Sequence, residues 1–112
     1  MAKGPLSGVK VLEYCSFIAG PYCTKLLADL GAEVIKVEKP EGDVARKHGP
    51  FLHNEPNPEC SSVFLYNNTN KMGVTLNLES PTGREIFKKL AAQADILLED
   101  GAPGEMKRLG LD

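Results

Sequence analysis

Three glutamates stand at the ends of short apolar runs, a placement that can support acid–base chemistry. Glu13, Glu38 and Glu99 each follow aliphatic residues that predict a β-strand. The carboxyl ends of parallel strands meet at one edge of a sheet, where ligands bind, and two carboxylates there can share acid and base roles. The sequence spacing does not establish that these glutamates meet, so we favour the simpler interpretation that they are solvated or bound by backbone amides.

The tripeptide Ala19-Gly20-Pro21 predicts a tight turn into a helix, and a helix N-terminus attracts anions such as phosphate. Pro21 has no N–H group to donate, and no GxGxxG pattern follows the preceding strand. An anion site here would be weaker than a full glycine-rich loop. We therefore favour an ordinary strand-to-helix turn with proline at the first helical position.

Basic and metal-ligating side chains form no strong motif. Arg46, Lys47 and His48 make a small basic cluster near the predicted ligand edge, where they could meet a phosphate, although such a cluster is usually solvated surface. His48 and His53 have no cysteine at ligand spacing, so we predict no metal site. The cysteines lack CxxC spacing, and we predict that all three thiols are reduced: Cys15, Cys23 and Cys60.

The first element that must position these side chains is a strand–helix–strand unit, typical of a parallel α/β sheet. It consists of a strand over 9–14, a helix over 21–30 and a strand over 32–38. Residues 43–70 then form an irregular connection, and connections of this length in a compact domain are usually functional or packed against something else. Within it, residues 61–66 fit either a short helix capped by serine or a buried strand.

A second unit follows the irregular connection. Alternating residues predict a strand over 74–78, and Ser80-Pro81 has the cap and first-position residues of a helix. A strand over 95–99 and a short helix over 104–109 complete the order. The sequence thus predicts a Rossmann-like parallel sheet with flanking helices. Such a four-stranded sheet has two edges to protect, so we expect residues 1–112 to form the N-terminal part of a larger fold or to need a second chain.

Composition narrows the function classes further. The chain has 112 residues, 42% of them hydrophobic and 25% charged, which is ordinary for a single globular domain. A formal net charge of −2 gives no basic field for nucleic acid or an acidic membrane. The sequence has no run long enough to span a membrane, and residues 1–5 lack the apolar region of a signal peptide. We predict a cytoplasmic protein with neither nucleic-acid nor membrane partners.

Several short strings, in their order and spacing, resemble the N-terminus of the class III coenzyme A (CoA) transferases, the CaiB/BaiF type. That family includes formyl-CoA and carnitinyl-CoA transferases, the bile-acid-inducible transferases and α-methylacyl-CoA racemase. The resemblance covers nearly the whole chain. The strings that carry it are LSGVKVLE (6–13), AGP (19–21), LADLGAEVIKVE (27–38), GD (42–43), NK (70–71), VTLNL (74–78), SPTGR (80–84), DILLE (95–99), PG (103–104) and LGL (109–111).

The resemblance implies a Rossmann-like domain in a dimer of two interlocked ring-shaped chains. It implies transfer of CoA between carboxylic acids through anhydride and thioester intermediates on an aspartate. That nucleophile lies beyond residue 112 in the family, so we assign no catalytic residue here. The ligand is acyl-CoA as a substrate, with no permanently bound cofactor, and the partners are a carboxylic acid and a second copy or chain that completes the fold.

The resemblance also assigns CoA-binding positions. Lys39 stands where the family often has an arginine near the CoA phosphates, and Arg108 matches a basic residue that reaches a phosphate. Asp100 and Gly101 replace a frequent Asn-Phe pair in the loop after a strand. The remaining positions are Phe17 and Ile18, in the loop that approaches the thioester, and Leu76, which packs near the adenine.

Two alternatives stay open. The same scaffold serves α-methylacyl-CoA racemisation, in which a base removes the proton next to the thioester and the residues that act lie further along the chain. A non-catalytic nucleotide-binding or assembly module would also fit a segment without a nucleophile. The identity of the acids is not determined by these residues.

Overall fold

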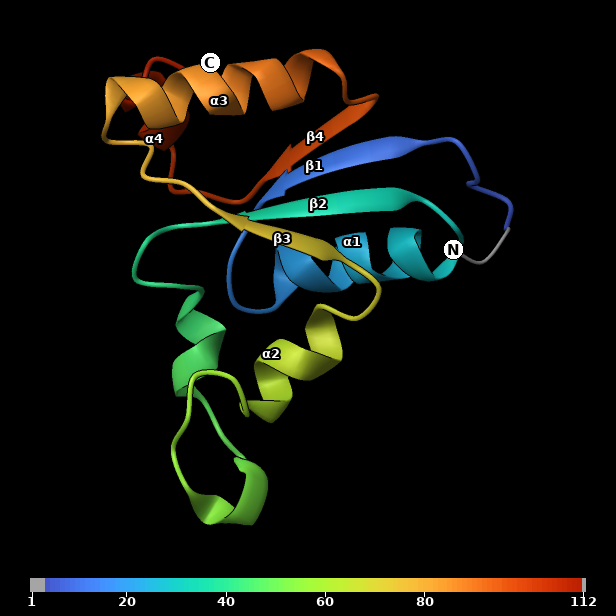
Figure 1. The fold of residues 1–112 in the computed structure, drawn as a ribbon, viewed down its shortest axis with the longest axis vertical. Helices are drawn as coiled ribbons and strands as arrows, with labels where there is room; N and C mark the ends of the chain where they lie inside the picture. Colours follow the sequence, from blue (N-terminus) through green and yellow to red (C-terminus); the bar gives the residue numbers. More distant parts are fainter. Residues whose placement is uncertain (1–3, 112) are drawn as a thin grey trace.

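Four parallel strands form one sheet in the computed structural model, which describes residues 4–111 (Figure 1). The strand order across the sheet is β3-β2-β1-β4, so the chain starts in the middle and adds a strand on each side. This confirms the predicted α/β class with an all-parallel sheet. The strands are β1 (Lys10–Tyr14), β2 (Glu33–Glu38), β3 (Met72–Thr75) and β4 (Ile96–Glu99).

Helices cover both faces of the sheet (Figure 1). Alternate residues of a strand point to opposite faces, so Val11 and Val34 pack with Ala28 on one side, whereas Leu12 and Phe87 pack on the other. The first of these sides carries α1, and the second carries α3 and α4. The helices are α1 (Ala19–Asp29), α2 (Ser62–Asn67), α3 (Pro81–Ala92) and α4 (Glu105–Arg108).

Local sequence explains where α3 begins. The Ser80 side chain accepts a hydrogen bond from the Gly83 amide at 3.4 Å, and Pro81 occupies the first turn, as predicted. Phe87 is buried and makes an edge-to-face contact with Tyr14, with ring centroids 5.9 Å apart. Ile86, the residue before Phe87, is exposed.

The connection from β2 to β3 folds away from the sheet as two 3₁₀ turns followed by α2 (Figure 1). Ser61 caps α2 by accepting from the Phe64 amide at 3.2 Å, which settles the helix-or-strand alternative for residues 61–66 in favour of the helix. The buried Ser61 hydroxyl also lies within hydrogen-bonding distance of the Ala45 and His48 carbonyls. Hydrogen bonds of a buried polar side chain therefore hold the segments of this connection together.

Two predicted element boundaries were wrong. The strand expected over 74–78 is β3, Met72–Thr75, because its backbone pairs with β2 from Ile35 to Glu38 and the chain then leaves the sheet. Leu78 lies beyond the strand and is buried beneath α3. The alternation of apolar and polar residues therefore continues past the end of β3 because Leu78 belongs to the core. The helix expected from Pro21 begins two residues earlier, at Ala19, and Pro21 lies inside its first turn.

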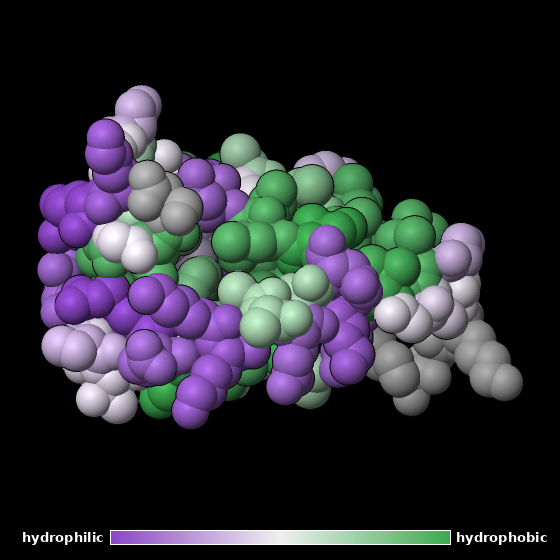
Figure 2. Space-filling model, turned by 90° about the horizontal axis from the view of Figure 1, so that it is seen from above, coloured by the Kyte–Doolittle hydropathy of each residue, from purple (hydrophilic) through white to green (hydrophobic). Residues whose placement is uncertain are grey.

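Apolar side chains remain on the outer surface of the segment. On α1, Ile18, Tyr22, Leu26 and Leu30 recur every fourth residue and are each more than 40% exposed. The edge strand β4 exposes Ile96 and Leu97. The view from above, which is the side of the molecule that carries α3 and not α1, also shows a hydrophobic region bordered by hydrophilic side chains (Figure 2). In residues 4–111 the structure has no helix with the length and apolar character needed to cross a membrane.

Candidate functional site

A cavity of about 590 Å³ lies at the carboxyl ends of the strands, where a parallel sheet is expected to bind ligands. The ends of β1, β2 and β4 all contribute to its wall. The lining comprises residues 14–16, 37–39, 41–44 and 100–102, together with Lys47 and Glu105. The cavity is therefore built by the loops that follow three different strands.

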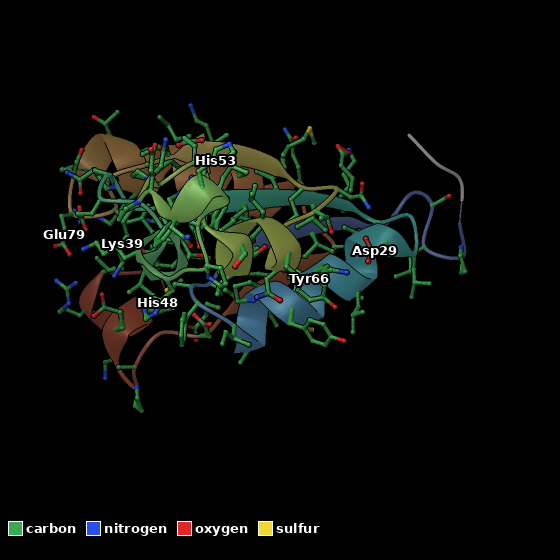
Figure 3. The ribbon with its side chains drawn as sticks, turned by 90° about the horizontal axis from the view of Figure 1, so that it is seen from below. Asp29, Lys39, His48, His53, Tyr66 and Glu79 are labelled. Atoms are coloured by element: carbon green, nitrogen blue, oxygen red, sulfur yellow. The ribbon has the colours of Figure 1, made fainter. Side chains whose placement is uncertain are left out.

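A second cavity, of about 160 Å³, adjoins the first. Tyr14, Lys39, Glu41 and Glu105 line both, and the smaller one extends to Arg108. Lys39 thus stands between the two spaces. Seen from below, Lys39, His48 and Glu79 lie toward the same end of the molecule, away from Asp29 (Figure 3).

Most carboxylates around the larger cavity already have a partner. Glu38 binds the Arg46 guanidinium through both oxygens, at 2.7 and 2.8 Å, and accepts from the Asp43 amide at 2.7 Å. Burial raises the pKa of Glu38, but the Arg46 side chain and the Asp43 amide outweigh that effect, so its pKa is lowered. Asp43 in turn forms an ion pair with buried Lys36, with Nζ 2.8 Å from Oδ2.

Asp100 occupies the N-terminal end of α1. Its carboxylate accepts from the Ser16 amide at 3.2 and 3.3 Å. Burial raises the pKa of Asp100, and hydrogen bonds from the backbone of Ser16 and Gly20 partly offset that rise. A Cβ on Gly20 would lie 2.5 Å from Cys15 and 2.8 Å from Asp100, so only glycine permits this approach. The anion position considered for residues 19–21 is thus taken by a carboxylate of the chain itself.

Two lysines of the larger cavity are free to meet a ligand. Within the part of the chain that the structure describes, Lys39 and Lys47 form no ion pair, and both are exposed. A lysine ammonium is a compact charge that binds phosphate well. The cavity therefore combines carboxylates that are mostly bound by other groups of the chain with two unengaged cations, Lys39 and Lys47.

Four of the seven predicted CoA-binding residues come together here. Lys39, Asp100 and Gly101 line the larger cavity, and Arg108 lines the smaller one. The Arg108 guanidinium lies 2.7 Å from a carboxylate oxygen of Glu79 and 2.8 Å from one of Glu105. Its hydrogen bonds to Glu105 and Glu79 raise the pKa of Arg108. Its guanidinium is consequently engaged within the segment.

The other three predicted residues lie outside the walls of both cavities. Phe17 has a left-handed backbone with φ of 70°, its amide donates to Asp43 at 2.9 Å, and its ring packs on His48 with centroids 4.8 Å apart. Ile18 is exposed at the start of α1. Leu76 is partly buried against the core beneath α3.

The three strand-end glutamates have separate surroundings. The expectation of a solvated or amide-bound carboxylate is wrong for Glu13, which is fully buried and paired with Lys36 at 3.1 Å and Lys71 at 2.8 Å. Glu38 accepts from an amide but is also ion-paired to Arg46, so Arg46 is not the free surface cation that its cluster suggested. Glu99 is exposed and accepts from the Gly101 amide, as expected.

Sequence reasoning missed several residues of the cavity. Tyr14 and Glu105 line both spaces, and Asp43 holds the Phe17 and Ala45 amides. Lys47 was noted only as part of a basic cluster. The Gly42-Asp43 pair could have drawn attention to Asp43, because a glycine followed by an aspartate after a strand is typical of a turn whose side chain binds nearby amides.

The three cysteines differ in how far they are exposed to solvent. All three cysteines are free thiols, with Cys15 buried, Cys60 half-buried and Cys23 exposed. Burial raises the pKa of Cys15 to about 12, and nearby Asp100 and Glu13 add to that effect. Residues 4–111 contain no cluster of three histidine, cysteine or acidic side chains that could hold a metal ion.

The chain belongs to the CoA-transferase family III, whose model matches residues 6–112. It is 46% identical over 92 residues to the succinyl-CoA:(R)-benzylsuccinate CoA-transferase subunit BbsE of Thauera aromatica, covering 82% of this chain and 22% of the relative. It is 44% identical over 109 residues to the succinyl-CoA:glutarate CoA-transferase of Homo sapiens, covering 96% of this chain and 24% of the relative.

Solved structures agree with this membership. A CAIB/BAIF family protein from Brucella suis superposes with a TM-score of 0.88 at 38% identity, over 99% of this chain and 29% of that one. Rv3272 from Mycobacterium tuberculosis superposes with a TM-score of 0.84 at 41% identity, over 99% and 29%. The chain thus spans about a quarter of the length of the curated relatives that it matches.

Proposed function

We propose that these residues form the CoA-binding N-terminal part of an enzyme that transfers CoA between carboxylic acids. The observation that carries the proposal is the cavity at the strand ends, in which Lys39 and Lys47 stay free while most of the surrounding carboxylates are engaged. CoA is a polyanion at its nucleotide end, so free cations beside a cavity of this size suit its phosphates.

Arg108 is the third cation of the proposed site. Its donors are held by Glu79 and Glu105, so a phosphate would have to compete with two carboxylates. The side chains of Arg108 and Glu79 are 53% and 63% exposed and that of Glu105 is 28% exposed, and pairs so open to solvent contribute little to stability. Replacing a carboxylate partner of Arg108 by a phosphate would therefore cost the protein little stability. We keep Arg108, with Lys39, among the proposed phosphate-binding residues.

In this proposal the other five predicted CoA-binding positions contact the uncharged parts of the ligand. Phe17 and Ile18 approach the thioester, Leu76 lies toward the adenine, and Asp100 and Gly101 border the ligand from the loop after β4. The nucleophile is not among these 112 residues, so the 112-residue chain alone has no CoA-transferase activity. A second copy of the chain, or another chain, covers the exposed faces of α1 and β4. The enzyme is located in the cytoplasm.

Transfer is favoured over the two alternatives by the relatives themselves. Two relatives, from Thauera aromatica and Homo sapiens, are CoA-transferases whose names pair succinyl-CoA with different acids. A racemase acting on an α-methylacyl-CoA would use the same CoA-binding cavity, with a base in place of the nucleophile. A non-catalytic assembly module would not need free lysines at the strand ends.

Titration of CoA and of pantetheine into the complete enzyme by calorimetry tests this proposal. A charge-assisted contact is worth about 1.5–3 kcal/mol, so Lys39→Ala should weaken CoA binding about tenfold or more. Pantetheine lacks the nucleotide phosphates, and its affinity should change little. The matched control is Lys88→Ala, which removes the same charge from an exposed position of α3 that lines neither cavity.

Two results would contradict the proposal. One is a Lys39→Ala enzyme that binds CoA as the parent does. The other is an equal loss for CoA and pantetheine, which would place Lys39 away from the phosphates. Exchange of CoA between acids by the purified 112-residue chain would show separately that the nucleophile lies within it.

A further inference from the structure

Four charged side chains are buried together beneath the larger cavity, on the α1 face of the sheet. Glu13 and Lys36 are register partners on β1 and β2, and each side chain is at most 3% exposed. Lys71 and Asp43 complete the set, also at 2% exposure or less. Two cations and two anions balance, as buried charges must. The arrangement is therefore a closed ionic cluster rather than a surface network.

Lys36 joins the cluster to the cavity wall. Its ammonium lies 3.1 Å from Glu13, 2.8 Å from Asp43, and 3.1 Å from the carbonyl oxygen of Cys15. Cys15 and Asp43 both line the cavity, one after β1 and the other after β2. The other oxygen of Asp43 accepts from the amides of Phe17 and Ala45, at 2.9 and 2.8 Å. One buried ammonium thus ties together the loops that leave two adjacent strands.

Lys71 belongs to the same cluster but reaches different groups. It lies 2.8 Å from Glu13 and donates to the Pro21 carbonyl at 3.0 Å and to Asn68 at 2.7 Å. None of these three residues lines either cavity. The two lysines therefore share burial, charge and a common carboxylate, and they differ in whether their contacts include the cavity wall.

We propose that Lys36 is a positioning residue for the acyl-CoA site: it holds the loops after β1 and β2 at the separation that the ligand requires. This inference rests on the proposed function. Phe17 needs such support, because a phenylalanine at positive φ is strained and persists only when its surroundings fix it. The Asp43 carboxylate that holds its amide is itself held by Lys36.

The test compares Lys36→Met with Lys71→Met in the complete enzyme. Both variants remove one buried ammonium and leave Glu13 with a single cation, so both should melt at lower temperature. Below both melting midpoints, Lys36→Met should weaken CoA binding about tenfold and raise KM for acyl-CoA, because displaced loops no longer present the ligand groups correctly. Lys71→Met should keep both constants within about twofold of the parent.

A second variant covers the case in which Lys36→Met does not fold. Asp43→Asn preserves the shape of the side chain and its acceptor for the Phe17 and Ala45 amides, while it removes the ion pair with Lys36. It should also weaken CoA binding, with a smaller loss of melting temperature.

The outcomes separate the two proposals. Equal CoA affinity and KM in the Lys36 and Lys71 variants, with parental CoA binding by Asp43→Asn, would overturn the positioning role and leave the proposed function standing. A parent enzyme that fails to bind CoA would overturn both. A selective effect of Lys36→Met and Asp43→Asn on CoA binding supports the inference.

Discussion

The guanidinium carbon of Arg46 lies 3.7 Å from the centre of the Phe64 ring, while the same guanidinium binds Glu38 through both carboxylate oxygens. A planar cation is thus placed between a strand end and α2. The contact explains why the irregular connection after β2 has a defined position relative to the sheet. It also makes this arginine unlike a solvated surface cation.

Replacement of Arg46 by lysine should destabilise the protein although the charge is kept. Lysine cannot form the two parallel hydrogen bonds to Glu38 or lie flat on Phe64, so we expect a loss of about 2 kcal/mol in the free energy of unfolding. Urea denaturation measures the change. Lys47→Arg, at a neighbouring exposed position, is the control and should be neutral; an equally small effect of both changes would contradict the argument.

Acid should weaken the Arg46–Glu38 pair in a defined pH range. The pKa of Glu38 is lowered in the folded protein, so its contribution to stability is present above about pH 4.5, the ordinary pKa of glutamate, and is lost as the pH falls through the folded pKa. The Glu38→Gln variant lacks this contribution. We expect the parent and the variant to differ in melting temperature at pH 7 and to converge toward pH 3; a constant difference would show that the carboxylate charge is irrelevant.

Removal of Glu79 should favour CoA binding if Arg108 reaches a phosphate. Glu79→Gln deletes one of the two carboxylates that engage Arg108, so we expect CoA affinity in the complete enzyme to rise severalfold, with the largest gain at low salt. Glu85→Gln, on α3 and outside both cavities, is the matched control. No change with Glu79→Gln, or the same gain with Glu85→Gln, would exclude a local competition for Arg108.

Thiol labelling should follow burial. At pH 8 a thiolate-directed reagent should modify exposed Cys23 first, while Cys15 stays unmodified because burial raises its pKa to about 12. Mass spectrometry of the labelled protein, with Cys23→Ser as the reference, measures the order. Rapid modification of Cys15 without denaturant would show that the β1 end is open to solvent.

The sequence predicted the sheet and its helices well because their signals are local. Ser80 is a capping residue, Pro81 suits the first turn and apolar residues recur along 86–91, and α3 forms over Pro81–Ala92. The end of β3 was placed too late because alternation at Leu76 and Leu78 continues past the last pairing with β2. Strand ends depend on a partner strand, which local periodicity does not contain.

The candidate site was only partly predictable for the same reason. Resemblance to relatives located Lys39, Asp100, Gly101 and Arg108 at the cavities. It could not indicate that Arg108 is engaged by Glu79, which is 29 residues away in the sequence. The cluster around Lys36 was missed entirely, since a single lysine in the middle of an apolar strand gives no sign of the buried carboxylates that permit it.

Asp100 at the head of α1 affects how a ligand can be oriented. The helix dipole and the Ser16 amide are already satisfied by this carboxylate, so a second negative group nearby would be repelled rather than attracted. The start of α1 is therefore unfavourable for a phosphate, whereas Lys39 and Lys47 remain unpaired at the same cavity. We expect a molecule with one polyanionic end and one neutral end to place its polyanionic end at these lysines.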